Sequence, residues 1–301
     1  MAQGDVHGQA MLGQERALVT VAAPGDLRLE FYGGVIARVE QALGVRLDRA
    51  TLLRKRRTIG ARSDRGTWVR IEARPVERVI SLGWGGVEAA GVLTGVAKPD
   101  WYQSVSWADP NQAAWWRADE TELISAAPIK PGGTISVDPG LPEGWWVSLR
   151  DSLAALAGHT TTRVAKLHSS RASQDYISSM VDKATGDAGV VVDSAVSEWV
   201  PAHADLTWAN LTAPECWVLD WEDWGAAPRG LDAATLLLAS LAVPTLAERI
   251  RREFAADLGS RSGQLVALTL CAELTSYPDY AGVLLEPARR EAGRLLDALT
   301  R

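Results

Sequence analysis

The sequence predicts an α+β fold in two lobes: a small N-terminal lobe with an antiparallel sheet and a larger, mainly helical C-terminal lobe. Two strand patterns joined by a turn occur between residues 50 and 74, and helix patterns follow one another from residue 231 to residue 299. Strands early and helices late are typical of α+β proteins. The length of 301 residues allows two lobes. We place the boundary between residues 126 and 127.

The composition excludes several classes of protein. Hydrophobic residues make up 47% and charged residues 23%, which are ordinary globular values. The net charge of −6 argues against a nucleic-acid partner held through its phosphates. Neither a signal segment nor an apolar run of membrane-spanning length occurs, so we expect a cytoplasmic protein with no membrane partner. Cys216 and Cys271 lie in apolar runs and are expected to be reduced core residues.

The elements of the first lobe follow from local patterns. Residues 1–13 are rich in Gly and Gln without an apolar period, so we expect them to be poorly ordered. Apolar residues recur every three to four positions in residues 26–44, which predicts an amphipathic helix. Residues 50–57 and 66–74 are expected strands, and the sequence Ser-Asp-Arg-Gly at residues 63–66 predicts the turn between them.

The remaining elements lead into the second lobe. Residues 85–93 predict a short helix, and residues 115–125 predict strands that end at an interlobe hinge. Two prolines and two glycines at residues 126–133 favour the hinge itself. Residues 145–158 predict the first helix of the second lobe. The late helices are expected at residues 231–242, 246–258, 264–274 and 288–299.

Most of the recognisable chemistry lies in residues 203–222. A pattern H-x-D-x-x-x-x-N is followed ten residues later by an Asp that ends an apolar run, as in phosphoryl-transfer sites. Asp205 is the candidate general base, because an attacking hydroxyl needs a carboxylate that takes its proton. Asn210 and Asp220 are the candidate ligands of Mg²⁺, which prefers oxygen. His203 is expected to brace the loop.

This segment resembles the aminoglycoside phosphotransferase and choline kinase group of small-molecule kinases. The group's loop usually has the sequence HGDLHxxN and its metal strand ends in DWE or DFE; here the loop is HADLTWAN and the strand ends in DWE. Ala204 replaces the usual Gly, and Asp232 follows where the group has a structural Asp. The resemblance implies a protein-kinase-like fold, ATP or GTP, Mg²⁺ and a small-molecule hydroxyl acceptor. An aminoglycoside, another antibiotic, an amino sugar or an amino alcohol all remain open.

The residue expected to bind the phosphates of the nucleotide differs from that of the group. Kinases use a lysine on the third strand, but no lysine occurs between Lys55 and Lys98. Arg70 stands at the expected place, with Glu88 as its candidate ion-pair partner and Gly60 as a candidate glycine of the phosphate loop. The alternatives are that Arg70 is an exposed strand residue and that Glu88 is a solvated helix acid.

Tryptophan is abundant, with thirteen residues against two phenylalanines. Core packing is the default for most of them. Trp208 is the exception that we expect at the acceptor pocket, because it lies inside the catalytic loop.

The motifs favour a kinase that transfers the γ-phosphoryl group of ATP or GTP to a small-molecule hydroxyl. A Walker A sequence, a G-x-S-x-G elbow and paired zinc-ligand spacings are all absent from the sequence. The alternative is a pseudokinase that only binds nucleotide, and the missing lysine and poor glycine loop support it.

Overall fold

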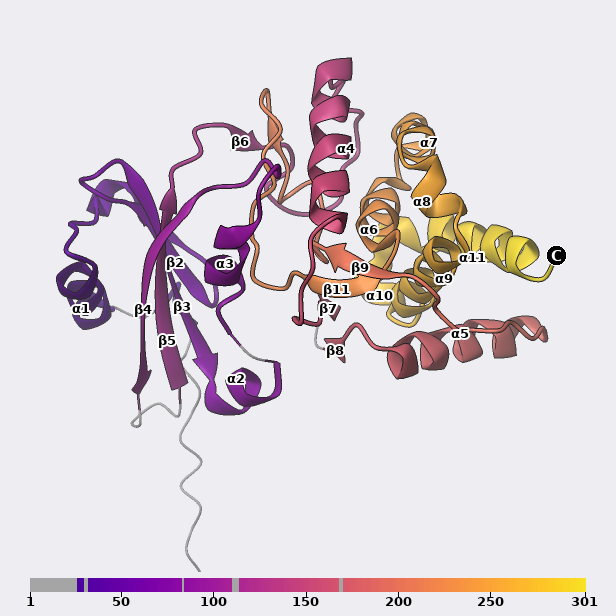
Figure 1. Cartoon of the computed structure of the whole chain (residues 1–301), viewed down its shortest axis with the longest axis horizontal. Coiled ribbons are helices and arrows are strands. Elements are labelled where there is room, and N and C mark those ends of the chain that lie inside the picture. The colour runs from indigo at the N-terminus through magenta and orange to yellow at the C-terminus, as the bar shows by residue number, and fades with distance from the viewer. Residues whose placement is uncertain (1–25, 30–31, 83, 110–113, 168–169) are drawn as a thin grey trace, which may run out of the picture.

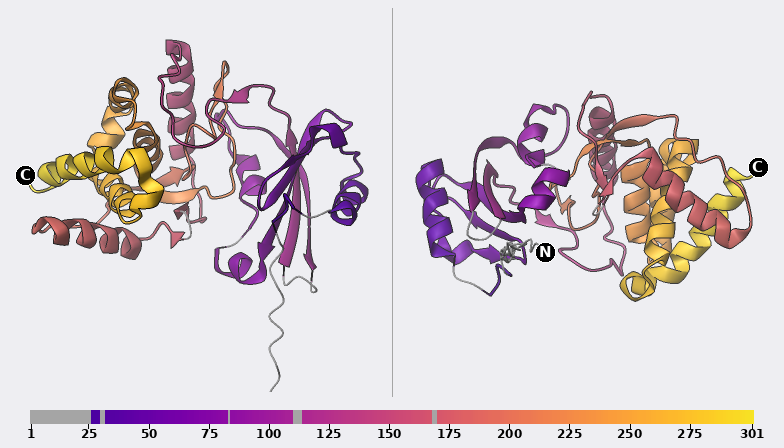
Figure 2. Two further views of the ribbon diagram at one scale, coloured as in Figure 1. Left: turned by 180° about the vertical axis from the view of Figure 1, so that it is seen from behind. Right: turned by 90° about the horizontal axis from the view of Figure 1, so that it is seen from below.

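Two lobes of different character make up the chain (Figure 1). A computed structural model describes residues 26–29, 32–82, 84–109, 114–167 and 170–301. The poor order expected of residues 1–13 falls outside these residues. A sheet with short helices forms the N-terminal lobe and helices dominate the C-terminal lobe, which confirms the predicted α+β, two-lobed architecture. Views from behind and from below keep the sheet and the long helices apart (Figure 2).

Five antiparallel strands form the sheet of the N-terminal lobe in the order β1-β2-β3-β5-β4. Their bounds are Leu53–Arg54 (β1), Thr58–Arg62 (β2), Thr67–Pro75 (β3), Trp101–Asp109 (β4) and Ala114–Glu122 (β5). The predicted turn between β2 and β3 is confirmed. Ser63 N donates to Thr67 O at 2.9 Å, and Gly66 takes the positive φ of +74° that the turn requires.

The predicted strand at residues 50–57 is wrong in its placement. Asp48 accepts a hydrogen bond from Ala50 N at 2.9 Å and so caps a 3₁₀ helix, η1 (Arg49–Thr51). The chain then forms only the two-residue strand β1 before the longer strand β2. Short polar side chains that bond the nearby backbone compete with extended structure, and this competition displaced the strand.

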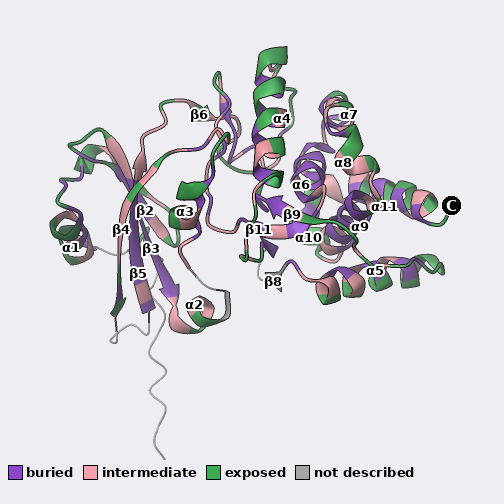
Figure 3. Ribbon diagram, viewed as in Figure 1, coloured by how far each residue is buried: buried purple, intermediate pink, exposed green. Residues whose placement is uncertain are grey.

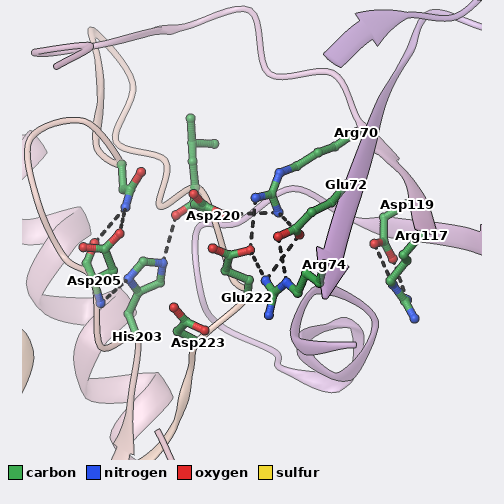
Figure 4. A network of polar contacts seen from close by, with 12 residues as sticks. Arg70, Glu72, Arg74, Arg117, Asp119, His203, Asp205, Asp220, Glu222 and Asp223 are labelled. Carbon is green, nitrogen blue, oxygen red and sulfur yellow. Dashed lines mark hydrogen bonds and ion pairs between the residues drawn. The ribbon is translucent and has the colours of Figure 1, made fainter. Parts of the chain in front are cut away.

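The two faces of β3 meet different surroundings. Val69 and Ile71 are fully buried in an apolar core with helix α1 (Gly33–Leu43), which covers the outer face of the sheet. Successive strand residues point to opposite faces. The residues between them therefore point toward the C-terminal lobe, as Figure 4 shows for Arg70, Glu72 and Arg74.

Helix α1 confirms the end of the helix predicted at residues 26–44. Gly44 takes a left-handed φ of +66° and donates its N–H to Glu40 O, which closes the helix. The helix begins only at Gly33, after a turn at residues 27–29.

Short helices connect β3 to β4: α2 (Val76–Leu82), α3 (Gly86–Ala89) and η2 (Ala90–Val92). The helix predicted at residues 85–93 is confirmed as α3 and η2, whereas α2 was not anticipated. Ala90 and Leu93 pack into the core of the C-terminal lobe. This connection is therefore attached to the C-terminal lobe although it precedes β4.

The C-terminal lobe is built around one buried helix. Helix α9 (Arg261–Thr275) is buried along most of its length and contacts α5, α6, α8, α10 and α11, as the purple centre of this lobe in Figure 3 shows. A helix that is apolar on all sides belongs in a core. None of the described helices is long and apolar enough to cross a membrane. The other helices are α4 (Glu143–Ala157), α5 (Gln174–Ala188), α6 (Leu231–Ser240), α7 (Pro244–Glu253), α8 (Ala255–Gly259), α10 (Pro278–Ala281), η3 (Gly282–Leu284) and α11 (Leu285–Leu299).

The predicted helices at residues 145–158 and in the last third of the chain are confirmed by α4, α6, α7, α9 and α11. Short two-stranded ribbons complete this lobe: β6 (Ala127–Pro128) with β10 (Thr212–Ala213), and β7 (Lys166–Leu167) with β8 (Ser170–Arg171). Because β6 already pairs within the C-terminal lobe, the chain crosses between the lobes just before it. The boundary between residues 126 and 127 stays a prediction.

Glu291 joins two C-terminal helices, so we expect its removal to lower stability. Its carboxylate is only 3% exposed and accepts hydrogen bonds from Arg294 on α11 and, at 2.8 Å, from Arg251 on α7. Glu291→Gln should lower the free energy of unfolding in urea by about 1–3 kcal/mol at pH 7, because hydrogen bonds between charged groups are lost. The matched control Glu286→Gln, an exposed partner of Arg289, should cost less than about 0.5 kcal/mol.

The effect of Glu291 should also depend on pH. Desolvation raises the pKa of Glu291, but the two arginines outweigh it and the net pKa is lowered. A carboxyl group with a lowered folded pKa stabilises the fold above its unfolded pKa of about 4.3 and loses that contribution as the pH falls below it. The difference between wild type and Glu291→Gln should therefore shrink from about pH 5 to pH 3. Equal losses for Glu291→Gln and Glu286→Gln would contradict this account.

Candidate active site

One ribbon fixes both ends of the segment that carries the motif. Strands β9 (Trp199–Ala202) and β11 (Gly225–Pro228) pair antiparallel, so residues 203–224 form a long excursion that starts and ends at the same place. Residues distant in sequence can meet within such an excursion. The close-up in Figure 4 shows three of the predicted site residues there, His203, Asp205 and Asp220.

A buried carboxylate holds the start of the loop. Asp232, in the first turn of α6, accepts hydrogen bonds from His203 N at 2.8 Å and from Ala204 N at 2.9 Å. Burial raises the pKa of Asp232, while His203 and the two backbone N–H bonds act in the opposite direction. Ala204 has a φ of +72°, a conformation that favours glycine. The Gly that the motif of the resembled kinases usually has here would adopt this conformation without strain.

His203 is fully buried and has a partner for each ring nitrogen. Its Nε2 lies 2.8 Å from Leu219 O, and its Nδ1 accepts a hydrogen bond from Asp205 N at 3.3 Å. The ring also stands edge-on to the indole of Trp221, with centroids 4.8 Å apart. These contacts tie the loop to the residues that precede Asp220 and leave neither ring nitrogen for a reacting group. The strand expected before Asp220 is wrong, because only a single β-bridge, between Leu211 and Val218, forms there.

Asp205 and Asn210 are hydrogen-bonded to each other. Asn210 Nδ2 donates to the Asp205 carboxylate at 2.9 Å and to its backbone carbonyl at 2.8 Å. Because the amide nitrogen is engaged in this way, the amide oxygen of Asn210 remains for another ligand. Asp205 itself is open to solvent. The walls of the site nevertheless displace part of its hydration and raise its pKa; nearby Asp220 adds to this effect, and His203 opposes it.

Asp220 has the properties expected of a ligand-binding carboxylate. Its backbone takes a φ of +67°, which a residue other than glycine rarely adopts outside functional sites. Its Oδ1 is buried without a hydrogen-bond partner among the described residues, and the guanidinium of Arg70 lies 3.5 Å away. A buried carboxylate oxygen without a hydrogen bond is costly unless a cation or another donor occupies the site.

Charged residues of β3 connect the sheet to this segment. Glu222 accepts hydrogen bonds from Arg70 at 3.0 Å and from Arg74 at 2.6 Å. Arg74 also pairs with Glu72 at 2.7 Å. Desolvation opposes ionisation of Glu222, but the two guanidinium groups hold its pKa well below the usual range. Glu222 is thus an ionised bridge between the lobes.

The expected ion pair between Arg70 and Glu88 is wrong. Glu88 on α3 pairs with Arg117 of β5 at 2.8 Å, and Arg117 is also bonded to Asp119. Arg70 is occupied by carboxylates of the segment 220–222 instead. By charge alone, Glu88 was a plausible partner for Arg70. The packing of the folded chain instead places Arg70 beside Asp220 and Glu222.

The position of Gly60 also differs from the expectation. Gly60 lies inside strand β2 and not in a phosphate loop. A Cβ added at this position would lie 2.2 Å from the ring of Trp68, so the glycine makes room for an indole. Gly60 does line the cavity between the lobes. Its contact with nucleotide stays a prediction.

The expected place of Trp208 at the acceptor pocket is wrong. Its side chain is only 2% exposed, and its Nε1 donates to Ser240 Oγ at 2.8 Å in the core of the C-terminal lobe. Its ring lies 6.2 Å from the ring of Trp145 and 6.3 Å from that of Trp146. The loop turns at Trp208 so that the apolar ring packs inward, which is the default for a large aromatic residue.

A cavity of about 460 Å³ lies between the lobes. Gly60 and Arg70 from the sheet line one side of it, and Asn210 and Asp220 from the motif line another. Its size is in the range of ligand pockets. Lys98, which the sequence offered after Arg70 as a further candidate for binding phosphate, also lines the cavity. The sequence did not single out the other polar lining residues, among them Asp119, Thr121 and Glu122.

Comparison with known proteins supports the fold. No protein-family model and no curated protein matches the sequence. The amicoumacin kinase hAmiN, solved with AMP-PNP, Ca²⁺ and Ami, matches at a TM-score of 0.50 and 11% identity, over 88% of this chain and 96% of that chain. APH(2")-IIa, solved with streptomycin and ATP, matches at a TM-score of 0.50 and 9% identity, over 86% and 96% of the two chains. The chain therefore has the kinase-like fold that its motif implied.

The close packing of Gly86 against the site generates a test. A Cβ on Gly86 would lie 2.1 Å from the carbonyl oxygen of Glu222, and Trp224 Nε1 donates to Gly86 O at 2.8 Å. Gly86→Ala should therefore destabilise the protein by about 1–3 kcal/mol in urea unfolding, because one backbone must move.

Gly34→Ala in α1 is the matched control. Its new Cβ would meet nothing within 4 Å, so stability should stay constant or rise by up to about 1 kcal/mol. If Gly86→Ala were as stable as Gly34→Ala, α3 would not be packed against residue 222 in solution.

Proposed function

We propose that the protein transfers the γ-phosphoryl group of ATP or GTP to a hydroxyl group of a small molecule. One observation carries this proposal: Asn210 and Asp220 line the cavity between the lobes, and Asp205 is bonded to Asn210 beside it. Phosphoryl transfer needs a nucleotide site, oxygen ligands for a cation and a carboxylate that is not consumed by that cation. Asn210 and Asp220 supply the oxygen ligands, Asp205 supplies the carboxylate, and the cavity offers the space for the nucleotide.

Asn210 and Asp220 fit a Mg²⁺ ion. Asp220 Oδ1, which has no hydrogen bond although Arg70 lies nearby, and the amide oxygen of Asn210 are hard ligands, and Mg²⁺ takes the rest of its ligands from phosphates and water. We assign these two as the protein ligands because both line the cavity between the lobes. When bound, Mg²⁺ would neutralise charge on the phosphates.

We assign Asp205 as the general base, which takes the proton of the acceptor hydroxyl. The amide of Asn210 holds its Oδ2, and the N–H bond to His203 fixes its backbone. The carboxylate is therefore oriented and remains open to solvent, where an acceptor can approach. Solved proteins of this fold include one named as an amicoumacin kinase, which supports a small molecule as the acceptor class.

Arg70 remains the candidate for the phosphate-gripping role. Its guanidinium lines the cavity next to Asp220 and could bind phosphate oxygens bidentately. Its contacts with Asp220 and Glu222 also favour the second hypothesis, a pseudokinase in which these ion pairs persist when nucleotide is bound. Turnover, and not nucleotide binding, separates the two hypotheses.

Asp220→Ala tests the cation site. In wild type, MgATP or MgGTP should raise the melting temperature, because a ligand that binds only the folded state stabilises it. Asp220→Ala should abolish this shift while the unliganded protein stays folded. Asp182→Ala, an exposed residue on α5, should keep the shift. A normal shift in Asp220→Ala would refute the assignment of Asp220 as the metal ligand.

Asp205→Asn tests the base. The amide keeps the shape of the carboxylate and can still accept from Asn210, so calorimetry should show almost normal binding of Mg-nucleotide. General-base assistance contributes about 10²- to 10⁴-fold, and turnover with a panel of aminoglycosides, amino sugars and amino alcohols should fall by that factor. Full turnover, or complete loss of nucleotide binding, would show that Asp205 has another role. Binding without turnover in wild type, across the whole panel, would favour the pseudokinase.

A further inference from the structure

A buried lysine that is not part of the motif lies in the wall of the cavity. Lys98 is only 6% exposed and lines the cavity. The backbone on its two sides is fixed: Val218 N donates to Ala97 O at 2.7 Å, and Glu122 N donates to Asp100 O at 2.8 Å. Lys98 therefore sits between the segment that precedes Asp220 and the point where β5 ends and the chain crosses between the lobes.

The side chain of Lys98 has no ion-pair or hydrogen-bond partner among the described residues, although it is almost fully buried. Lys166, which is also buried, pairs with Asp223 at 3.1 Å. Burial lowers the pKa of Lys98, while Asp100 and Glu122 act in the opposite direction from beyond ion-pair distance. The Lys98 nitrogen is not among the buried side-chain atoms that lack a partner, so it is reached from the cavity that Lys98 lines. Charged or neutral, a lysine nitrogen donates hydrogen bonds, and a ligand in the cavity can supply the acceptor.

The lining of the cavity includes a group of polar residues and a group of apolar residues. Arg70, Asn210 and Asp220 form the part proposed for the phosphates and cation. The flat nucleobase is then left with the apolar part, which includes Leu123, Ile124, Ala126 and Ala127 of the crossing between the lobes. Lys98 lies beside this crossing, because the hydrogen bond from Glu122 N to Asp100 O holds the chain next to Lys98 against the end of β5. It is thus placed to meet an edge of the base.

We propose that Lys98 selects guanine over adenine, so that the phosphoryl donor is GTP. Guanine presents two adjacent acceptors on one edge, O6 and N7, whereas adenine presents N7 beside the N6 amino group, which is a donor. A lysine nitrogen finds two acceptors on guanine and is opposed by a donor on adenine. This inference rests on the proposed function, because it assigns the nucleotide of the same site.

Calorimetry with the full-length protein and Mg²⁺ tests the proposal, using the imido analogues of GTP and ATP to prevent turnover. Wild type should bind the GTP analogue more tightly than the ATP analogue. Lys98→Met should weaken the GTP analogue by about 10- to 100-fold, because a hydrogen bond from a charged donor is lost, and should leave the ATP analogue unchanged or tighter. ITP, which keeps O6 and N7 but lacks the 2-amino group, should follow GTP.

Two further variants keep the test decisive. Lys98→Gln retains a neutral donor and adds an acceptor, so it should bind both analogues with similar affinity. Lys183→Met removes an exposed lysine of α5 that does not line the cavity, and it should leave the preference of wild type intact. The melting temperature of each variant checks its folding.

The contrary outcomes are distinct. A preference of wild type for ATP would overturn the guanine assignment and leave the proposed function standing. Equal weakening of both analogues in Lys98→Met would also overturn it, since Lys98 would then serve the phosphates or the fold. If no Mg-nucleotide bound to wild type, both the proposed function and this inference would fail.

Discussion

The carboxylate of Glu222 is the contact on which the candidate site depends. The sheet and the helical lobe have separate apolar cores, and near the site they are joined by the ion pairs of Glu222 with Arg70 and Arg74. Partly buried ion pairs gain little net stability, because desolvation offsets the attraction. Their geometry is nevertheless specific. Glu222 therefore fixes where Asp220, two residues earlier, stands relative to β3, more than it stabilises either lobe.

The sequence was informative wherever function restricts the order of residues locally. The spacing of His203, Asp205, Asn210 and Asp220 placed four polar residues on one excursion, and the structure brings them together around Leu219 and the Asp205 carboxylate. Helices with a strong apolar period were also found. Strand β4 and helix α5 were missed, because β4 is a sheet edge with mostly half-exposed side chains and α5 has few large apolar residues.

Contacts between distant segments could not be predicted in the same way. The sequence suggested Glu88 as the partner of Arg70, but in the fold Glu88 pairs with Arg117 and Glu222 pairs with Arg70. Trp208 follows the same rule, since the sequence shows a large ring in a loop but not which side of the loop is core. The alternation of charge at positions 70, 72 and 74 was a usable signal, because a strand presents alternate residues on one face.

The attachment of the segment before β4 has a consequence for motion. Ala90 and Leu93 belong to the C-terminal core, and Ala97 is bonded to Val218 and, at 3.1 Å, to Ser152. If the lobes part, the backbone of Ala97 stays with the segment that carries Asp220, while Arg70 and Arg74 leave with the sheet. Because each lobe keeps its own apolar core, such an opening exposes charges and not core surface, so a bound molecule can be exchanged without local unfolding.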